Sequence, residues 1–259
     1  MDSILDPILE LLVWAILLLT PLLLGLLWFW HKRRDSLPDV RPLPAFQDLQ
    51  DEVKRAAESG KTIHIALGSG GLNGEDAVTS LAGIQVVEAL ADDAVAYDAA
   101  PIITVGDPTL LPLAQDALRR VYERRGLADL YDSNQVRFIA PSPVAYAAGA
   151  ANVLATEDVT ANAMAGAFGA EVSLITDAGA RLDLSQLAAA AASDAIGVLY
   201  PATGRLAIGE ELYAAGAQMT RERRYAVSLV AQDILRILLV LLISGMAVLT
   251  FLSSLGILR

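Results

Sequence analysis

Glycines between positions 68 and 74 are the first residues whose type and spacing suggest chemistry. The stretch "GSGGLNG" follows an apolar run, and two acids, Glu75 and Asp76, come directly after it. Glycines at a turn from strand to helix let a phosphate approach the backbone, as in dinucleotide-binding folds. The candidate ligand-binding residues of this loop are Gly68, Ser69, Gly70, Gly71, Asn73 and Gly74.

The spacing of these glycines fits phosphate binding only in part. Gly68 and Gly70 supply the G-x-G of a dinucleotide fingerprint, but the third glycine falls at 74 instead of 73. Gly74 is followed by Glu75 and not by Lys, which excludes a P-loop. The two acids stabilise an empty helix N-terminus and oppose an anion. We therefore expect a tight strand-to-helix turn, with a nucleotide-binding turn as the alternative.

Polar residues after other apolar runs are candidates for further walls of such a site. Open α/β sheets bind ligands at the carboxyl ends of their strands. Asp107, in "VGDP", is placed like a ribose-binding acid, and Ser142, in "APSP", and Thr203, in "YPATG", add polar groups. Asp107 and Ser142 have an alternative interpretation as helix caps. Glu171 follows two glycines and receives no role from the pattern.

Other kinds of catalytic site find little support in the sequence. The chain has no cysteine and two histidines, of which only His64 lies in the central region. No G-x-S-x-G or D-x-D-x-D-G motif is present. We therefore assign no catalytic residue, no metal ligand and no cofactor beyond the possible nucleotide, and we expect His64 to be a packed core residue.

The elements that would position these residues alternate along the chain. Short apolar runs typical of strands covered on both faces are separated by helix-like segments, which predicts a Rossmann-like parallel α/β sheet. We predict strands at 62–67, 102–105, 136–140, 172–175 and 196–200. We predict helices at 47–59, 75–91, 110–125, 143–153, 158–168, 184–192 and 208–219.

Two long apolar segments flank this region. Ile8–Trp30 contains 23 residues with Glu10 as its only charge, and Ile237–Leu258 contains 22 residues without charge. Each is long enough for a bilayer core of about 30 Å, so both are predicted to span a membrane. The predicted divisions are an anchor at 1–34, a Pro-rich linker and short helix at 35–60, the α/β domain at 61–220, and a basic segment with the second span at 221–259.

Charge predicts the orientation and the partners. Basic residues lie where both spans meet the central region, so the positive-inside rule places that region in the cytoplasm and both termini outside, which predicts a two-pass membrane protein. The central residues 35–220 carry 25 Asp and Glu against 11 Lys and Arg, which argues against nucleic-acid binding. The basic residues expected to meet membrane lipid are Lys32, Arg33, Arg34, Arg221, Arg223 and Arg224.

Four motifs carry a family resemblance: "GSGGLNGEDAVTSLAG", "TVGDPTLLPLAQDALR", "VAYAAGA" and "GEELYAAGAQ". Together they resemble an uncharacterised family of bacterial, Chloroflexota-type membrane proteins with two spans and a domain of unknown function. The resemblance covers about residues 60–218 and supplies no catalytic residue. We expect a structural or accessory protein that self-associates or binds other membrane proteins. The alternative is a membrane-tethered sensor that binds a nucleotide or similar small molecule at Gly68–Gly74.

Overall fold

A computed structural model of the chain describes residue 14 and residues 18–29, 49–220 and 223–254. The chain divides into two compact units, residues 41–220 and residues 1–40 together with 221–259. The first unit contains a six-stranded sheet in which every neighbouring pair of strands is parallel. The second contains helix α10 (Arg223–Ser254).

The strand order of the sheet is β3-β2-β1-β4-β5-β6. This is the order of doubly wound dinucleotide-binding sheets. Strands β1 to β3 are added towards one edge of the sheet and strands β4 to β6 towards the other, so the strand order reverses between β1 and β4. The predicted parallel α/β fold is therefore confirmed. The strands are β1 (Thr62–Gly68), β2 (Ile102–Val105), β3 (Val136–Phe138), β4 (Val159–Ala167), β5 (Ser185–Ala190) and β6 (Arg205–Ile208).

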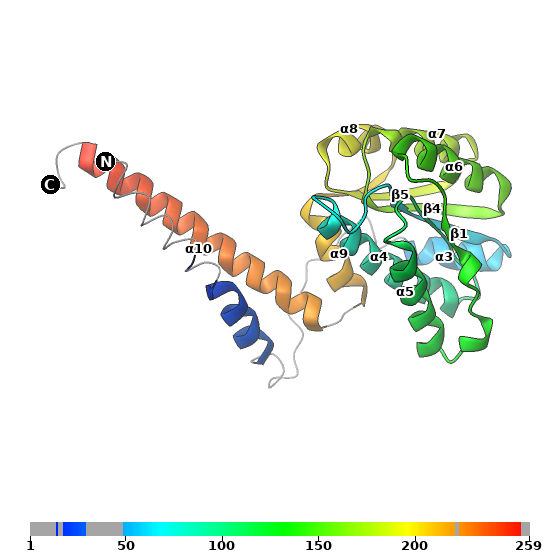
Figure 1. Ribbon diagram of the computed structural model, residues 1–259, viewed down its shortest axis with the longest axis horizontal. Helices are drawn as coiled ribbons and strands as arrows, with labels where there is room; N and C mark the ends of the chain where they lie inside the picture. Colours follow the sequence, from blue (N-terminus) through cyan, green and yellow to red (C-terminus); the bar gives the residue numbers. More distant parts are fainter. Residues whose placement is uncertain (1–13, 15–17, 30–48, 221–222, 255–259) are drawn as a thin grey trace. The chain divides into compact units, whose positions relative to one another are not determined.

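Helices cover both faces of the sheet, as Figure 1 shows. One face carries α3 (Leu49–Glu58), α4 (Ala77–Ala96), α5 (Leu111–Arg124) and α9 (Glu210–Thr220). The other face carries α6 (Pro143–Thr156), α7 (Ser173–Arg181) and α8 (Ser193–Ala202). Short 3-10 helices occur at Ala128–Leu130, Ser133–Gln135 and Ala170–Val172.

Alternation along β1 explains why both faces are filled. Ile63, Ile65 and Leu67 pack against the α4 side, whereas Ala66 packs against the α6 side. The predicted short helix at 47–59 corresponds to α3, and its Val53 is fully buried in the core on the α4 side. The domain core therefore includes a helix that lies before the predicted domain start at residue 61.

In the second half of the domain, the predicted strands and helices are exchanged. The predicted strand 172–175 lies in a 3-10 turn and the start of α7, and the predicted strand 196–200 lies within α8. The predicted helices 158–168 and 184–192 correspond instead to β4 and β5. Their many alanines favour helix by intrinsic propensity, but burial of the strands on both faces overrides that preference.

The close approach of α4 explains why β4 needs small residues. Ala161, Ala163 and Ala165 alternate along β4 and face α4. A Cβ atom on Gly83 of α4 would lie 2.5 Å from the carbonyl oxygen of Ala165, so the helix backbone rests almost directly on the strand. Larger side chains at the alternating positions would push the helix away.

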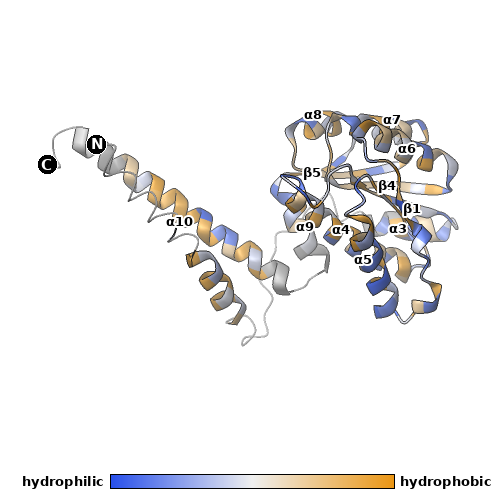
Figure 2. Ribbon diagram, in the orientation of Figure 1, coloured by the Kyte–Doolittle hydropathy of each residue, from blue (hydrophilic) through white to orange (hydrophobic). Residues whose placement is uncertain are grey.

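Helix α10 contains the one candidate membrane span found among the described residues, Val227–Ala247. Figure 2 shows its apolar character over much of its length. This window begins ten residues before the predicted span 237–258 and includes Asp233 and Arg236, whose charged groups lie 4.0 Å apart. Residues 255–258 of the predicted span lie outside the described part. Within predicted span 8–30, Leu18–Phe29 forms a shorter apolar helix.

Candidate functional site

The loop between β1 and α4 lies at the point where the strand order reverses. Gly68 ends β1 and pairs with Ala167 at the end of β4. Gly68 has a φ of +89°, and a Cβ atom there would collide with the carbonyl group of Ala167. Residue 68 must therefore be glycine because of the strand geometry alone, without reference to any ligand.

The first three backbone N–H groups of this loop donate to acceptors within the protein. The N–H group of Gly68 donates to the hydroxyl oxygen of Tyr146 at 3.1 Å. The N–H groups of Ser69 and Gly70 both donate to the carbonyl oxygen of Ala167, at 3.0 and 3.3 Å. A phosphate-binding loop instead directs such donors at its ligand. This part of the loop is closed by protein contacts.

Asp107 holds the middle of the loop in place through hydrogen bonds. Its Oδ1 atom accepts a hydrogen bond from the backbone N–H of Thr109 at 2.8 Å and a second one from the Thr109 hydroxyl. The Thr109 Oγ1 atom in turn accepts the N–H of Leu72 at 3.0 Å. Both carboxylate oxygens of Asp107 lie 2.6 Å from where a Cβ atom of Gly71 would be. Gly71 is small because the Asp107 carboxylate lies against it.

A second carboxyl side chain covers Gly70. The Cβ atom of Asp76 lies 2.8 Å from the position of a Cβ on Gly70. Asp76 is the N-cap residue of α4, and its side chain makes no capping hydrogen bond. Glu75 beside it is exposed. Two carboxylates, those of Asp76 and Asp107, thus face the glycines where a dinucleotide fold would hold a pyrophosphate.

Glu171 is a structural residue of this loop that the sequence pattern did not identify. Its Oε1 atom accepts hydrogen bonds from the Ser69 hydroxyl at 3.0 Å and from the N–H of Gly169 at 2.9 Å. Glu171 comes directly before the strand predicted at 172–175, but it lies in the 3-10 turn after β4, where it links the end of β4 to the end of β1. The pair of glycines before it was the available signal.

A row of hydrogen-bonded polar groups, most of them buried, crosses the strands of the sheet. His64 and Asn162 are partners in the β1–β4 register, and Asn162 and Gln186 are partners in the β4–β5 register. The Nδ1 atom of His64 lies 2.7 Å from Oδ1 of Asn162. The Nδ2 of Asn162 donates to Oε1 of Gln186 at 3.4 Å, and Nε2 of Gln186 donates to the carbonyl oxygen of Thr176 at 3.0 Å.

The same row continues from the histidine to the glycine loop. The Nε2 atom of His64 lies 3.0 Å from the Thr104 hydroxyl, which lies 3.2 Å from the Tyr146 hydroxyl. Because Asn162 donates to Gln186, its oxygen accepts from His64, so the proton is on Nδ1 and Nε2 accepts from Thr104. We call these side chains the polar row: His64, Thr104, Tyr146, Asn162 and Gln186.

The polar row is neutral at ordinary pH. His64 is fully buried, and burial lowers the pKa of its imidazole to about 4, although the hydrogen bond to Asn162 acts in the opposite direction. Burial also raises the pKa of the Tyr146 hydroxyl to about 12. His64 is thus the packed core histidine that its sequence position suggested, and its hydrogen bonds are satisfied within the protein.

The remaining predicted ligand contacts are scattered. Asn73 and Gly74 are exposed on the outer part of the loop, and Gly74 has a φ of +88°. Ser142 is the exposed N-cap residue of α6, and its side chain makes no capping hydrogen bond. The strand expected before Thr203 is wrong: Thr203 is the C-cap residue of α8, and α8 leads into the amino end of β6. Thr203 therefore lies at the sheet edge opposite the glycine loop.

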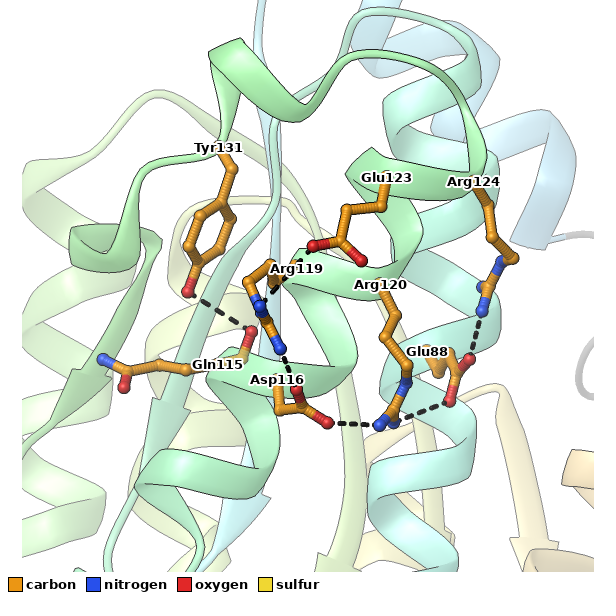
Figure 3. Close-up of polar contacts among 8 residues, drawn as sticks. All are labelled: Glu88, Gln115, Asp116, Arg119, Arg120, Glu123, Arg124 and Tyr131. Carbon is orange, nitrogen blue, oxygen red and sulfur yellow. Dashed lines mark hydrogen bonds and ion pairs between the residues drawn. The ribbon is translucent and has the colours of Figure 1, made fainter.

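The arginines near the end of α5 are engaged in ion pairs, which Figure 3 shows. Arg124 lies 2.5 Å from Glu88, a carboxylate on α4 whose side chain is only 10% exposed. Arg120 also contacts Glu88, at 3.5 Å, and Arg119 lies 2.7 Å from Asp116 of its own helix. The two contacts with Glu88 join α4 to α5, and all three ion pairs leave the arginines poorly suited to hold an external anion.

The basic residues predicted at the membrane edge fall largely outside the described residues. Lys32, Arg33, Arg34 and Arg221 are not described, and Arg223 and Arg224 are described only as the first residues of α10. The predicted lipid contacts of these side chains stay predictions. Within the described part of the chain, no three His, Asp or Glu side chains are grouped closely enough to hold a metal ion.

Sequence comparison places the chain in a family. A profile described as a domain of unknown function, DUF6754, matches residues 8–257, so the match includes both flanking segments as well as the sheet domain. The chain belongs to this family. No curated protein and no solved structure matches it.

Proposed function

We propose that the chain is a membrane-tethered structural or accessory protein that acts by self-association or by binding other membrane proteins. The observation that carries this proposal is the closed glycine loop. Three successive N–H groups, those of Gly68, Ser69 and Gly70, donate to Tyr146 and Ala167 instead of facing outward. The domain has the sheet of a nucleotide-binding protein without free donors at the start of its loop.

Energetics favour this interpretation over nucleotide binding. To admit a phosphate, the loop would exchange hydrogen bonds that each contribute about 1 kcal/mol for contacts with the ligand. The phosphate would also meet the carboxylates of Asp76 and Asp107, which pack against Gly70 and Gly71. The same carboxylates lie close to the N-terminus of α4, where negative charge is favourable without a ligand.

The membrane setting of the proposal rests on α10 and on charge. The span Val227–Ala247 supplies one candidate anchor, and the apolar segment at 8–30 supplies the second in the proposed two-pass topology. The basic residues on the inner sides of both segments support a cytoplasmic domain with both termini outside, in a bacterial inner membrane. A tethered domain is held near other membrane proteins, which raises its effective concentration for them.

One observation favours the alternative, a membrane-tethered sensor of a nucleotide or similar small molecule. The strand order β3-β2-β1-β4-β5-β6 places the glycine loop and Asp107 at the reversal point where such sheets bind ligands. In this alternative, ligand binding would open the loop and break the contact between Tyr146 and Gly68.

Native mass spectrometry of the full chain after mild detergent extraction tests both functions. We expect a defined oligomer, or a complex with another membrane protein, without a bound small molecule. ATP and NAD⁺ added to the sample should not bind with saturation. Saturable binding that Asp107→Asn removes would support the sensor and overturn our proposal. Asp129→Asn is the matched control, since Asp129 is exposed in a 3-10 turn after α5.

A further inference from the structure

The outer part of the glycine loop combines a labile sequence with an open structure. Asn73 precedes Gly74, and both residues are exposed. A Cβ atom added to Gly74 would meet no atom of the described residues within 4 Å, so the space on that side of the residue is open. The inner glycines of the same loop are closely covered by Asp76 and Asp107, and the two parts of the loop therefore differ in accessibility.

The backbone N–H of Gly74 and the side chain of Asn73 also make no hydrogen bond within the described part of the chain. No acceptor for the Gly74 N–H lies among the residues that the structure describes, and the Asn73 side chain makes no hydrogen bond to any of them. Most backbone N–H groups in folded regions are held by an acceptor, and such an N–H cannot act as a nucleophile while it donates. Glycine adds no side chain that would shield its own nitrogen from the preceding residue.

We propose that Asn73 is a site of spontaneous deamidation. The deprotonated backbone nitrogen of Gly74 attacks the side-chain Cγ of Asn73 and a new C–N bond forms. The Cγ–Nδ2 bond then breaks, and the amide nitrogen takes up a proton from water and leaves as ammonia. The product is a five-membered succinimide. Water then adds to one of its two carbonyl carbons and opens the ring, which yields aspartate or isoaspartate. No oxidant, metal or enzyme is required.

The modification changes the loop in two ways. It adds a carboxylate two residues before Glu75, so that three of the four residues 73–76 before α4 are acidic. Isoaspartate also routes the backbone through the side chain, which lengthens the loop by one methylene. Both changes act on the exposed part of the loop and leave the contacts of Gly68, Ser69 and Gly70 in place. The modification is irreversible without a repair enzyme and accumulates with the age of the protein.

The test is peptide mapping by mass spectrometry of the full folded chain after incubation at mildly alkaline pH, with fragmentation that separates aspartate from isoaspartate. Asn134 and Asn152 are internal controls. Both are exposed, but the N–H after Asn134 donates to the Asp132 carbonyl and Asn152 lies within α6. We expect loss of the Asn73 amide, with both products present, while the control asparagines keep theirs. The loss should be slower at pH 6, since the nucleophile is a deprotonated nitrogen.

A second sample, incubated in denaturant, separates the effect of the fold from that of the sequence. We expect Asn73 to deamidate in the folded chain at a rate close to that in the denatured chain. Retention of the Asn73 amide in the folded chain, together with its loss in denaturant, would mean that the fold protects the loop and would overturn the proposal. Equal loss at Asn73 and at both controls would overturn it as well.

Discussion

The two faces of the sheet are filled in different ways. On the face of α4 and α5, the strands present apolar side chains such as Ile65, Leu67 and Ile103. On the face of α6 and α7, the polar row crosses four strands amid apolar neighbours. Apolar contacts stabilise without direction, whereas a hydrogen-bonded row requires one register and one orientation of each group. The comparison suggests that the first face supplies most of the stability and the second fixes the strand ends that hold the glycine loop.

The largest effect is expected from a cavity on the apolar face. Leu118 of α5 is fully buried, and Leu118→Ala should lower the free energy of unfolding by about 3 kcal/mol because it removes packed methyl groups and leaves a void. Thermal unfolding of the full chain in detergent, followed by circular dichroism, measures this change. Leu130→Ala is the control, since Leu130 is 63% exposed and its truncation should have little effect. Equal effects of the two substitutions would contradict the prediction.

A smaller effect is expected when the polar row is interrupted. His64→Leu keeps the volume of the side chain roughly constant but leaves the Asn162 oxygen without its donor and the Thr104 hydroxyl with Tyr146 alone, at a cost of about 2 kcal/mol. The double variant His64→Leu with Asn162→Leu should lose less free energy of unfolding than the sum of the two single variants. The reason is that it removes the unpaired Asn162 oxygen together with its donor. Strict additivity in the same unfolding assay would show that the two side chains act independently.

The polar row also predicts a dependence on pH. The pKa of His64 is about 4 in the folded protein and about 6.5 in the unfolded chain, so between these values only the unfolded chain takes up the proton. Stability from this group is complete above pH 6.5 and declines as the pH falls, by about 1 kcal/mol at pH 5.5. Unfolding at pH 7.5 and 5.5 should show this loss in the wild type in excess of that in His64→Leu. Parallel curves for the two proteins would refute the assignment.

The smallest effect should come from an exposed ion pair on the surface of α5. Arg119 is half exposed and pairs with Asp116 and Glu123, both within α5. Arg119→Gln should change stability by less than about 0.5 kcal/mol, because solvent screens such pairs. Its melting temperature should approach that of the wild type, even at low salt. A loss as large as that of Leu118→Ala would mean that this surface contributes to the core in a way that burial does not reveal.

Sequence reasoning located the first half of the sheet but not the second. Strands β1 to β3 contain β-branched residues, such as Ile63, Ile102 and Val136, and these patterns are typical of buried strands. Alanine dominates in β4, where α4 approaches closely, and in β5, and propensity favours helix for such segments. The apolar runs in α7 and α8 were therefore wrongly predicted as the remaining strands. The alternation of Ala161, Ala163 and Ala165 was the available signal, with the period of a strand.

The candidate site was predicted in position but not in detail. The glycine loop after β1 and the place of Asp107 after β2 follow from the pattern, and the structure brings them together. The role of Tyr146 did not follow, because its helix reads as an ordinary small-residue segment and its contact with Gly68 joins residues 78 positions apart. Such contacts depend on the register of several strands, which a single sequence does not specify.

The direction of the polar row has a consequence for how the family can diverge. Hydrogen bonds link its groups in order from the N–H of Gly68 at one end to the carbonyl oxygen of Thr176 at the other, and the Tyr146 hydroxyl contacts both the hydroxyl and the carbonyl oxygen of Thr104. A substitution at His64, Asn162 or Gln186 alone leaves a buried donor or acceptor without its hydrogen-bond partner. Related sequences should therefore either keep these three residues together or replace them together by apolar ones. These three residues would then be inherited as one unit, although they lie on three separate strands.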